Sequence, residues 1–371
     1  MESKTQPGKL LWLNGKIIFF DDILSKKPED LGVSGSFELD TIRVIREWVS
    51  GRKSFEIRSS GSTGRIKKFR ISREKLQSSA NLTIQSLGLK EGMRAVLCLN
   101  PIYTAGFLFL IRSLIGKFNL YAVTPSALPL SDLPDQTLID FISLVPNQLY
   151  EIIHKTDFNR WFGHESTILV GGAPVPAALQ RQIEYLPGRI YHTFGMAETL
   201  SHIALKKLNG NDRTESFETL RSVTVKADER NCLIISAPHL SSRAIHTQDV
   251  IQIIDTRHFL WKGRLDSIIN TGGYKIHIEE LENEIEKIFN EVSIPNNFMI
   301  APTPDPKLGE RIVLLVEGKP AKPDEHLLSE ILKAQLDKYH NPKQIFILEE
   351  FLYTESRKID RIRTRALILN R

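Results

Sequence analysis

Helix-like and strand-like segments alternate through the middle of the chain, and this alternation restricts the fold more than any other feature of the sequence. The helix-like segments are residues 75–87, 107–115 and 177–185, and the strand-like segments are residues 95–99 and 167–170. Residues 138–145 are apolar but fit either structure. Strands that alternate with helices pair in a mostly parallel sheet, so the sequence predicts an α/β fold.

The pattern changes twice towards the C-terminus. Residues 222–254 contain short β-like runs (SVTVKA, CLIISA and VIQIID) separated by turn residues, which predicts a small β subdomain. Amphipathic helices at residues 279–289 and 325–336 then flank a strand at residues 312–316. We therefore expect two domains, residues 1–265 and 266–371, with the boundary near Asp266. Two domains also suit a length of 371 residues.

Composition and charge exclude several classes of protein. The formal net charge is only +5 and no nucleic-acid-reading module is recognisable, so no nucleic-acid partner is predicted. The two cysteines, Cys98 and Cys232, form no CxxC or Cys/His cluster, which argues against a disulfide framework and a structural zinc site. The most apolar run, residues 105–116, contains Arg112 and is too short to span a bilayer. No signal peptide is recognisable, and we expect a cytoplasmic protein.

A Ser/Gly-rich run at residues 58–68, RSSGSTGRIKK, has the composition of a phosphate-binding loop. Glycine lets backbone N–H groups approach an anion closely, and hydroxyls and a lysine add donors and charge. The candidate phosphate ligands are Ser59, Ser60, Gly61, Ser62, Thr63, Gly64 and Lys67. The spacing does not match the GxxxxGK[ST] loop. A solvated linker of the same composition is the alternative.

Three further segments carry candidate chemistry. In YHTFGMAETLSH, residues 191–202, Glu198 is a hard oxygen ligand suited to Mg²⁺, although a capped strand-to-helix turn would look the same. In GRLDSIINTGGYK, residues 263–275, Arg264 can form paired hydrogen bonds to a phosphate or ribose, whereas a plain hairpin turn is the alternative. The third, SRKIDR at residues 356–361, reads on its own as a basic surface tail.

Taken in order, the motifs SSGSTGRIKKF, TFGMAET, Asp249, GRLDSIINTGG and RKIDR resemble the adenylate-forming superfamily of acyl-CoA synthetases, carrier-loading adenylation domains and luciferases. The resemblance extends from about Ser59 to the C-terminus. Within the superfamily, YHTFGMAETLSHIALKKLNG, VPNQL, VGGAP and FLWKGRLDSIINTGG look most like the o-succinylbenzoate–CoA ligases of menaquinone synthesis. About a hundred residues of the usual N-terminal region ahead of the phosphate loop are expected to be absent.

This resemblance implies a large adenylate-forming domain with mixed sheets and helices, followed by a small, mobile α+β domain. A carboxylic acid would react with ATP to give acyl-AMP and pyrophosphate, and CoA would then displace AMP, with Mg²⁺ as the metal. The resemblance places the β- and γ-phosphates on the Ser60–Lys67 loop, the adenine against Phe194, Mg²⁺ on Glu198 and the ribose on Asp249 with Arg264. Lys358 would neutralise charge at the α-phosphate. The C-terminal domain would pivot at Asp266, so that the Gly272–Gly273 loop replaces Lys358 and faces CoA.

The resemblance also implies where the substrate and nucleotide lie. The acyl pocket and the adjoining nucleotide site would be formed by Tyr103, Thr104, Gly106, Val145, Gly171, Gly172, Ala173, Thr193, Gly195, Met196, Ser201 and His202. A dicarboxylate substrate such as o-succinylbenzoate needs a cation for the carboxylate that is not activated. Lys68, Arg70 and Arg112 are the candidates, and the sequence does not choose among them.

Some positions depart from the pattern of the resembling family, namely Ile66, Ala197, Gln248 and Arg357. None of them removes a charged group that the chemistry requires. Two alternatives therefore stay open. One is adenylation of another aryl acid, with transfer to CoA or to a carrier protein, and the other is a degenerate nucleotide-binding protein without activity. The oligomeric state is not readable from the sequence.

Overall fold

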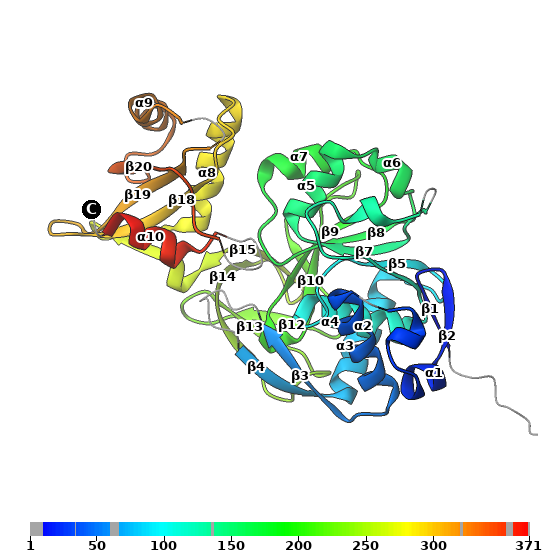
Figure 1. Cartoon of the computed structure of the whole chain (residues 1–371). Helices are drawn as coiled ribbons and strands as arrows, with labels where there is room; N and C mark the ends of the chain where they lie inside the picture. Colours follow the sequence, from blue (N-terminus) through cyan, green and yellow to red (C-terminus); the bar gives the residue numbers. More distant parts are fainter. Residues whose placement is uncertain are drawn as a thin grey trace, which may run out of the picture.

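The computed structural model describes residues 10–33, 35–59, 67–134, 137–319, 322–353 and 359–369. Figure 1 shows a large body that contains the chain up to β15 and a smaller lobe formed by the C-terminal elements, joined at β14 and β15. Among the described residues, no helix has the length and apolar character needed to cross a membrane.

A sheet of 13 strands runs through the large body, in the order β12-β13-β14-β15-β11-β10-β9-β8-β7-β5-β6-β1-β2. Its strands are β1 (Leu10–Leu13), β2 (Lys16–Phe19), β5 (Arg94–Leu97), β6 (Asn119–Ala122), β7 (Phe141–Leu144), β8 (Thr167–Val170), β9 (Arg189–Gly195), β10 (His202–Lys207), β11 (Phe217–Thr219), β12 (Thr224–Ala227), β13 (Cys232–Ser236), β14 (Ile245–Ile253) and β15 (His258–Arg264). The strands from β9 through β8, β7, β5 and β6 to β1 are parallel.

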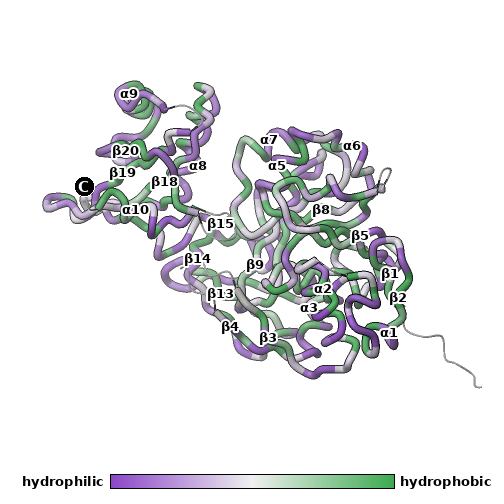
Figure 2. The backbone as a smooth tube through the Cα atoms, viewed as in Figure 1, coloured by the Kyte–Doolittle hydropathy of each residue, from purple (hydrophilic) through white to green (hydrophobic). Residues whose placement is uncertain are grey.

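The parallel half of the sheet is buried on both faces, which explains its nearly continuous apolar runs. All four residues of β8 are buried, as are the last three of β5. The helices of the large body are α1 (Phe20–Ser25), α2 (Ser36–Val49), α3 (Arg73–Leu87), α4 (Thr104–Gly116), α5 (Pro146–Lys155), α6 (Phe158–Trp161) and α7 (Ala177–Ile183). Figure 2 shows that hydrophobic residues are concentrated in the central strands and hydrophilic residues on the outer turns.

The remaining strands of the large body are antiparallel. β12, β13 and β14 lie where the sequence predicts a small β subdomain. They do not form a sheet of their own, because β14 pairs with β15 and β15 pairs with β11, which links them to the large sheet. A separate antiparallel pair is formed by β3 (Ser54–Ser59) and β4 (Lys67–Ser72).

The smaller lobe is an α+β unit. Its sheet has five strands in the order β17-β16-β19-β18, with β20 paired to β19. The strands are β16 (Ile268–Thr271), β17 (Tyr274–His277), β18 (Phe298–Asp305), β19 (Gly309–Glu317) and β20 (Gln344–Leu348), and the helices are α8 (Ile278–Glu291), α9 (Glu325–Gln335) and α10 (Arg361–Leu369). The two sheets are connected by a short 3-10 turn at Leu265–Ser267, which contains Asp266.

Candidate active site

The carboxyl ends of the parallel strands bring most of the predicted pocket residues to one edge of the large sheet. Val145 follows β7, Gly171 follows β8, and Gly195 ends β9. Tyr103 and Thr104 begin α4 after β5. In open α/β sheets, ligands bind at this edge. The fold therefore places these residues where a ligand site is expected.

Two glycines at this edge allow backbone and side chains to approach closely. A Cβ built on Gly171 would lie 2.2 Å from the Thr193 hydroxyl oxygen, and one built on Gly106 would lie 2.3 Å from the carbonyl oxygen of Asn100. A Cβ on Gly195 would lie 2.4 Å from the carbonyl oxygen of Ser201. Side chains at these positions would displace the neighbouring strand or turn.

Hydrogen bonds of the Thr199 hydroxyl hold the turn that carries Glu198. The buried Thr199 hydroxyl accepts the backbone N–H of Met196 at 3.0 Å and donates to the carbonyl of Ser201 at 2.7 Å. Glu198 lies exposed in the same turn, and no ion pair joins it to another described residue. One free carboxylate beside a triphosphate is the ligand arrangement that Mg²⁺ commonly uses, because phosphate oxygens and waters complete its shell. Within the described ranges, no cluster of three or more metal-ligating side chains occurs.

Asp249 lies buried on β14, directly opposite Arg264 on β15. The indole N–H of Trp261 donates to its Oδ1 at 3.0 Å, and Arg264 Nη1 lies 3.8 Å from Oδ2. Burial raises the pKa of Asp249. Arg264 makes its closer contacts with Asp266, at 2.8 and 2.9 Å, and these hydrogen bonds lower the pKa of Asp266. Asp249 thus presents a second oxygen that a pair of ribose hydroxyls could reach.

Phe194 is part of an aromatic cluster beneath the same edge. Its ring packs edge-on against Phe259, with centroids 5.2 Å apart, and lies 5.4 Å from Phe217. His192, two residues earlier on β9, is partly buried, and desolvation together with the nearby Lys206 lowers its pKa to about 4 and keeps the imidazole neutral. The rings around Phe194 give this part of the strand an apolar surface that suits an aromatic base.

A buried cation lies behind the Glu198 turn. Arg112 on α4 is only 4% exposed, and its Nη2 donates to the hydroxyl of Ser201 at 3.1 Å. Its Nε has no partner, and no described carboxylate pairs with the guanidinium. Burial lowers the pKa of Arg112 to about 10, so it stays charged at neutral pH.

The partly buried His202 completes this polar cluster. Its Nε2 lies 3.2 Å from the hydroxyl of Thr83, and its Nδ1 lies 3.4 Å from the hydroxyl of Ser201. Burial and the nearby Arg112 lower the pKa of His202, so its imidazole is neutral. We call Arg112, Ser201, His202 and Thr83 the Arg112 cluster. It provides one uncompensated positive charge at the predicted acyl pocket.

The other two candidate cations have different surroundings. Lys68 forms an ion pair with Glu56 at 3.2 Å, and both side chains are more than half exposed. Arg70 is also exposed, on the same β4 strand, directly opposite Glu56. Solvent screens both charges, so neither needs a ligand for compensation.

Some predicted residues lie outside the described part of the chain or close to its edges. Ser60, Gly61, Ser62, Thr63, Gly64 and Lys358 all fall outside the described residues. Lys67 begins β4 opposite Ser59, so the two ends of the Ser/Gly-rich run are held together. Tyr353 and Ile359 pair on either side of the Lys358 segment in the same way. Ala173 and Gly172 follow β8, and Gly172 adopts a φ of 83°.

The Gly272–Gly273 motif forms the tight turn between β16 and β17. Both glycines have positive φ, 58° and 86°, as a two-residue hairpin turn requires. Tyr274 follows the turn and stacks on Tyr339, with ring centroids 3.8 Å apart. The sequence alternative of a hairpin turn is thus correct for the backbone, and any role of this turn towards CoA stays a prediction.

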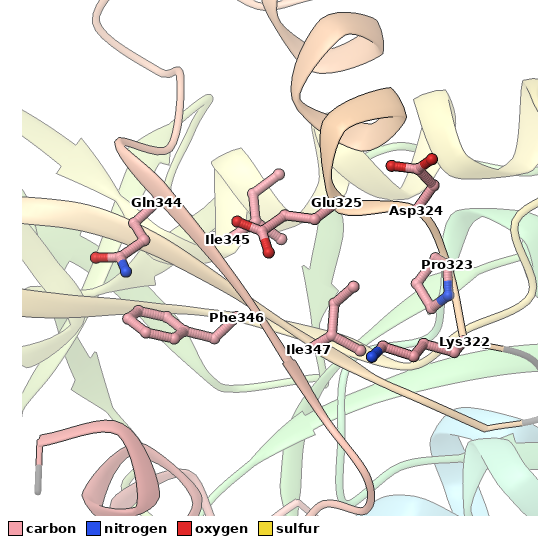
Figure 3. A pocket seen from close by; sticks show the side chains of 8 residues that line it. All are labelled: Lys322, Pro323, Asp324, Glu325, Gln344, Ile345, Phe346 and Ile347. Atoms are coloured by element: carbon pink, nitrogen blue, oxygen red, sulfur yellow. The ribbon is translucent and has the colours of Figure 1, made fainter. Parts of the chain in front are cut away.

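Two cavities lie in the smaller lobe, and no predicted motif residue lines either of them. One of about 470 Å³ lies between the start of α9 and β20, lined by residues 322–325 and 344–347 (Figure 3). The other, of about 400 Å³, is lined by Lys333, Leu336, Lys338, Asn341, Pro342 and Lys343. None of its three lysines forms an ion pair with a described carboxylate.

Sequence reasoning missed the partners of the site residues. Trp261, which donates a hydrogen bond to Asp249, lies in the motif FLWKGRLDSIINTGG. The sequence of this motif does not indicate which acceptor the indole N–H binds. Thr83 lies on α3 with no motif around it. Glu286 on α8 accepts a hydrogen bond from the backbone of Ala177 at 3.1 Å, a contact between the two lobes that only the fold reveals.

Comparison with known proteins gives a consistent picture. A family model described as AMP-binding enzyme matches residues 56–227. The structure of an acyl-CoA synthetase (AMP-forming)/AMP-acid ligase II-like protein from Dyadobacter fermentans is 34% identical, covers 90% of this chain and 95% of that one, and has a TM-score of 0.59. The 2-succinylbenzoate–CoA ligase of Lactococcus lactis is 25% identical over 92% of this chain and 75% of its own length.

A more distant structure agrees in fold. The O-succinylbenzoate coenzyme A synthetase of Bacillus subtilis, solved in complex with ATP and magnesium ion, is 19% identical with a TM-score of 0.70. The match covers 84% of this chain and 69% of that one.

Proposed function

Because the chain belongs to the family of AMP-forming acyl-CoA synthetases and AMP-acid ligases, we propose that it joins o-succinylbenzoate to CoA through an acyl-AMP intermediate. ATP supplies the AMP group, and pyrophosphate leaves. In the second step the CoA thiol attacks the acyl carbonyl and releases AMP. The relatives named for 2-succinylbenzoate support this acid, and the Arg112 cluster is the observation in this chain that carries it.

A buried guanidinium without a carboxylate partner carries a desolvation cost, which an anion supplied by a ligand would offset. Arg112 fulfils this condition, whereas Lys68 and Arg70 do not, because they are exposed. The Ser201 hydroxyl, which Arg112 holds, adds a hydrogen-bond partner for the same anion. A substrate with one carboxylate to activate and a second to anchor satisfies this cluster. An aryl dicarboxylate has this form.

The chemistry of adenylation requires two anions to meet, so positioning and charge neutralisation dominate. We assign the phosphates to Ser60, Ser62, Thr63 and Lys67, and charge neutralisation at the α-phosphate to Lys358. Bound Mg²⁺, held by Glu198, would neutralise further phosphate charge. Asp249 would accept hydrogen bonds from the ribose hydroxyls, because Trp261 occupies only its Oδ1. Phe194 would face the adenine.

CoA is the proposed acceptor, in preference to a carrier protein, because the smaller lobe offers a cavity with nucleotide chemistry. Lys333, Lys338 and Lys343 line it with uncompensated charge. Tyr339 adjoins it, with the Lys338 ammonium 6.0 Å from its ring centroid. Lysines bind phosphates and aromatic rings stack on bases. Both co-substrates are metabolites of the cytoplasm, which is the compartment we expect.

The test is pyrophosphate release from ATP and Mg²⁺ with o-succinylbenzoate, benzoate, other aryl acids and short fatty acids, each with and without CoA. We expect release with o-succinylbenzoate and a CoA thioester detectable by mass.

Arg112→Gln should raise the KM for o-succinylbenzoate about 10- to 100-fold, because a charge-assisted contact is lost. The KM for a monocarboxylic acid should not change. Dephospho-CoA should have a KM at least about tenfold above that of CoA.

Arg70→Gln is the matched control, since it removes an exposed arginine from the same body. It should leave the KM for the acid unchanged. A higher KM in Arg70→Gln but not in Arg112→Gln would refute the assignment of the anchoring cation. Release with a different acid would retain the enzyme class and change the substrate. Pyrophosphate release without a CoA thioester would favour the carrier-protein alternative. Silence with every acid, while ATP still binds, would favour the degenerate nucleotide-binding protein.

A further inference from the structure

The Arg112 cluster continues beyond His202 into helix α3. Nε2 of His202 lies 3.2 Å from the hydroxyl oxygen of Thr83, and the Thr83 hydroxyl lies 3.3 Å from the backbone carbonyl oxygen of Ser79, one turn earlier in α3. Thr83 and Ser79 are both buried. Arg112 donates to the Ser201 hydroxyl at 3.1 Å, and that hydroxyl lies 3.4 Å from Nδ1 of His202. These four contacts connect a buried guanidinium to the backbone of a helix, and we call them the Arg112–Ser79 relay.

The number of hydrogens on each group restricts how this relay can be made. A guanidinium only donates and a backbone carbonyl only accepts, whereas a hydroxyl has one hydrogen and also accepts. Desolvation and the charge of Arg112 lower the pKa of His202, so its ring carries one N–H, on either Nδ1 or Nε2. Each of these two tautomers therefore fixes the direction of every other hydrogen bond in the relay.

The Nε2–H tautomer makes all four contacts. The ring donates to Thr83, the Thr83 hydroxyl donates to the Ser79 carbonyl, and the Ser201 hydroxyl donates to the bare Nδ1 of His202. Every hydroxyl and ring hydrogen of the relay then has an acceptor. Because a buried donor without an acceptor is costly, we expect this tautomer in the protein without a ligand. The Ser201 hydrogen points to His202 in this state and is not available to an anion.

The Nδ1–H tautomer arranges the same groups for an anion. The ring donates to Ser201, whose oxygen then accepts from both His202 and Arg112, and Thr83 donates to the bare Nε2. The Ser201 hydrogen is now free to turn towards an anion that Arg112 binds. The contact between Thr83 and Ser79 is given up in exchange. A hydrogen bond to a charged acceptor is roughly twice as strong as one between neutral groups, so a carboxylate at Arg112 favours this tautomer.

We propose that a carboxylate bound at Arg112 moves the ring hydrogen of His202 from Nε2 to Nδ1, and that Thr83 is the positioning residue that serves both states. This inference rests on the proposed function, since the anion is the second carboxylate of the acid. The ring loses one proton and gains one, so the net charge of the relay does not change. A threonine hydroxyl accepts in the first state and donates in the second, whereas a valine of nearly the same shape does neither. Thr83 thus helps to select a dicarboxylate without touching it.

The tautomer of His202 is the direct test. Long-range ¹H–¹⁵N correlation spectra of protein labelled at histidine distinguish the two ring nitrogens. The signal that is absent from a His202→Gln variant identifies His202 among the 10 histidines. We expect Nε2–H without ligand and Nδ1–H with saturating o-succinylbenzoate. The same tautomer with and without the bound acid would overturn the proposal.

The acid dependence of the reaction tests the role of Thr83. Thr83→Val should raise the KM for o-succinylbenzoate about five- to tenfold, because one hydrogen bond of the bound state is lost. The KM for a monocarboxylic acid and the KM for ATP should stay unchanged, and Thr83→Ser should keep the native KM because it retains the hydroxyl. Thr41→Val is the matched control, since the buried Thr41 makes the same kind of hydrogen bond, to the carbonyl of Phe37 at 2.8 Å, within helix α2. Urea unfolding should show a similar loss of stability in both valine variants.

The outcomes separate this inference from the proposed function. A native chain that releases no pyrophosphate with o-succinylbenzoate would contradict the proposed function, and this inference with it. A native chain that uses the acid, while Thr83→Val and Thr41→Val have the same KM for it, would overturn this inference alone. A KM that Thr83→Ser raises as much as Thr83→Val does would also overturn it, because packing of the threonine side chain would then be the cause and the hydroxyl would be irrelevant.

Discussion

A single carboxylate, Asp249, is the residue at which we expect the stability of the fold and the affinity for nucleotide to be linked. Burial raises its pKa above the ordinary value of 3.8. The folded state therefore binds this proton more tightly than the unfolded state does. As a result, the stability that Asp249 contributes falls as the pH rises from about 3.8 through the folded pKa. At neutral pH the buried charge destabilises the chain, and we expect it to be retained because ribose hydroxyls need an ionised acceptor.

Asp249→Asn should therefore separate the two effects. The free energy of unfolding at pH 7 should rise, by about 1.4 kcal/mol for each unit of pKa shift removed, because an amide is neutral. The KM for ATP should increase about tenfold, since a hydrogen bond to a charged acceptor is lost. Thermal or urea unfolding measures the first effect, and pyrophosphate release at varied ATP measures the second.

Asp255→Asn serves as the comparison, because Asp255 is an exposed aspartate at the turn between β14 and β15. It should leave the KM for ATP unaltered. An Asp249→Asn chain that is less stable and binds ATP normally would show that the carboxylate is structural.

At the scale of residues, motif order made Glu198 and Asp249 candidates, because charged groups at fixed motif positions are recognisable without a fold. Their partners were not predictable. The donor to Asp249 is Trp261, twelve residues away on a neighbouring strand, and hydrogen-bond pairing across strands depends on register. Arg112 remained one of three candidates for the same reason, because burial distinguishes it and burial is a tertiary property.

At the scale of elements, the contact between the end of β8 and β9 is the tightest packing near the site. Gly171→Ala would bring its Cβ to 2.2 Å from the Thr193 hydroxyl oxygen. We expect the free energy of unfolding to fall by about 1–3 kcal/mol, as in other overpacked positions. Thr193→Ala in the same chain should restore most of this loss, because the next atom, Thr193 Cβ, is 3.6 Å away. Urea unfolding of both single variants and the double variant measures the coupling.

If the double variant is as unstable as the sum of the two single variants, the strain lies in the Gly171 backbone and the contact with Thr193 is irrelevant.

A helix is the easier element to predict, since its apolar residues repeat along its own length. The sequence located α3, α4, α8 and α9 to within about three residues. Residues 138–145 were ambiguous because the strand there, β7, has only four residues and an almost uninterrupted apolar run.

Topology was harder to predict than elements. The strands β12 to β14 were expected, yet their connection to the large sheet through β15 and β11 was not. Antiparallel neighbours that are distant in sequence leave no local signal, because pairing depends on which edges remain free when the rest of the sheet has formed.

At the scale of the whole molecule, Glu286 joins the two lobes. Helix α7 of the large body begins at Ala177 without a side-chain cap of its own, because the preceding residue is Pro176. Glu286 of the smaller lobe supplies the missing acceptor at 3.1 Å, and Arg181 on α7 stabilises the same carboxylate. A cap of this kind stabilises a helix by about 1 kcal/mol. It exists only in the arrangement of the lobes seen here.

Any rotation of the smaller lobe between adenylation and thioester formation, as the family resemblance implies, must break this contact. Glu286→Ala should therefore shift the equilibrium away from the present arrangement about fivefold, the equivalent of 1 kcal/mol. Single-molecule fluorescence transfer between labels on α6 and α9 measures the populations directly.

Ala177→Pro removes the donor instead of the acceptor, and proline is well tolerated at the first position of a helix. The two variants should shift the populations equally and without further effect in combination, because they delete the same bond. Glu291→Ala, at the far end of α8, should shift nothing. Additive shifts from the first two variants would mean that Glu286 acts on the lobes through another contact, and that the cap of α7 does not bias the motion.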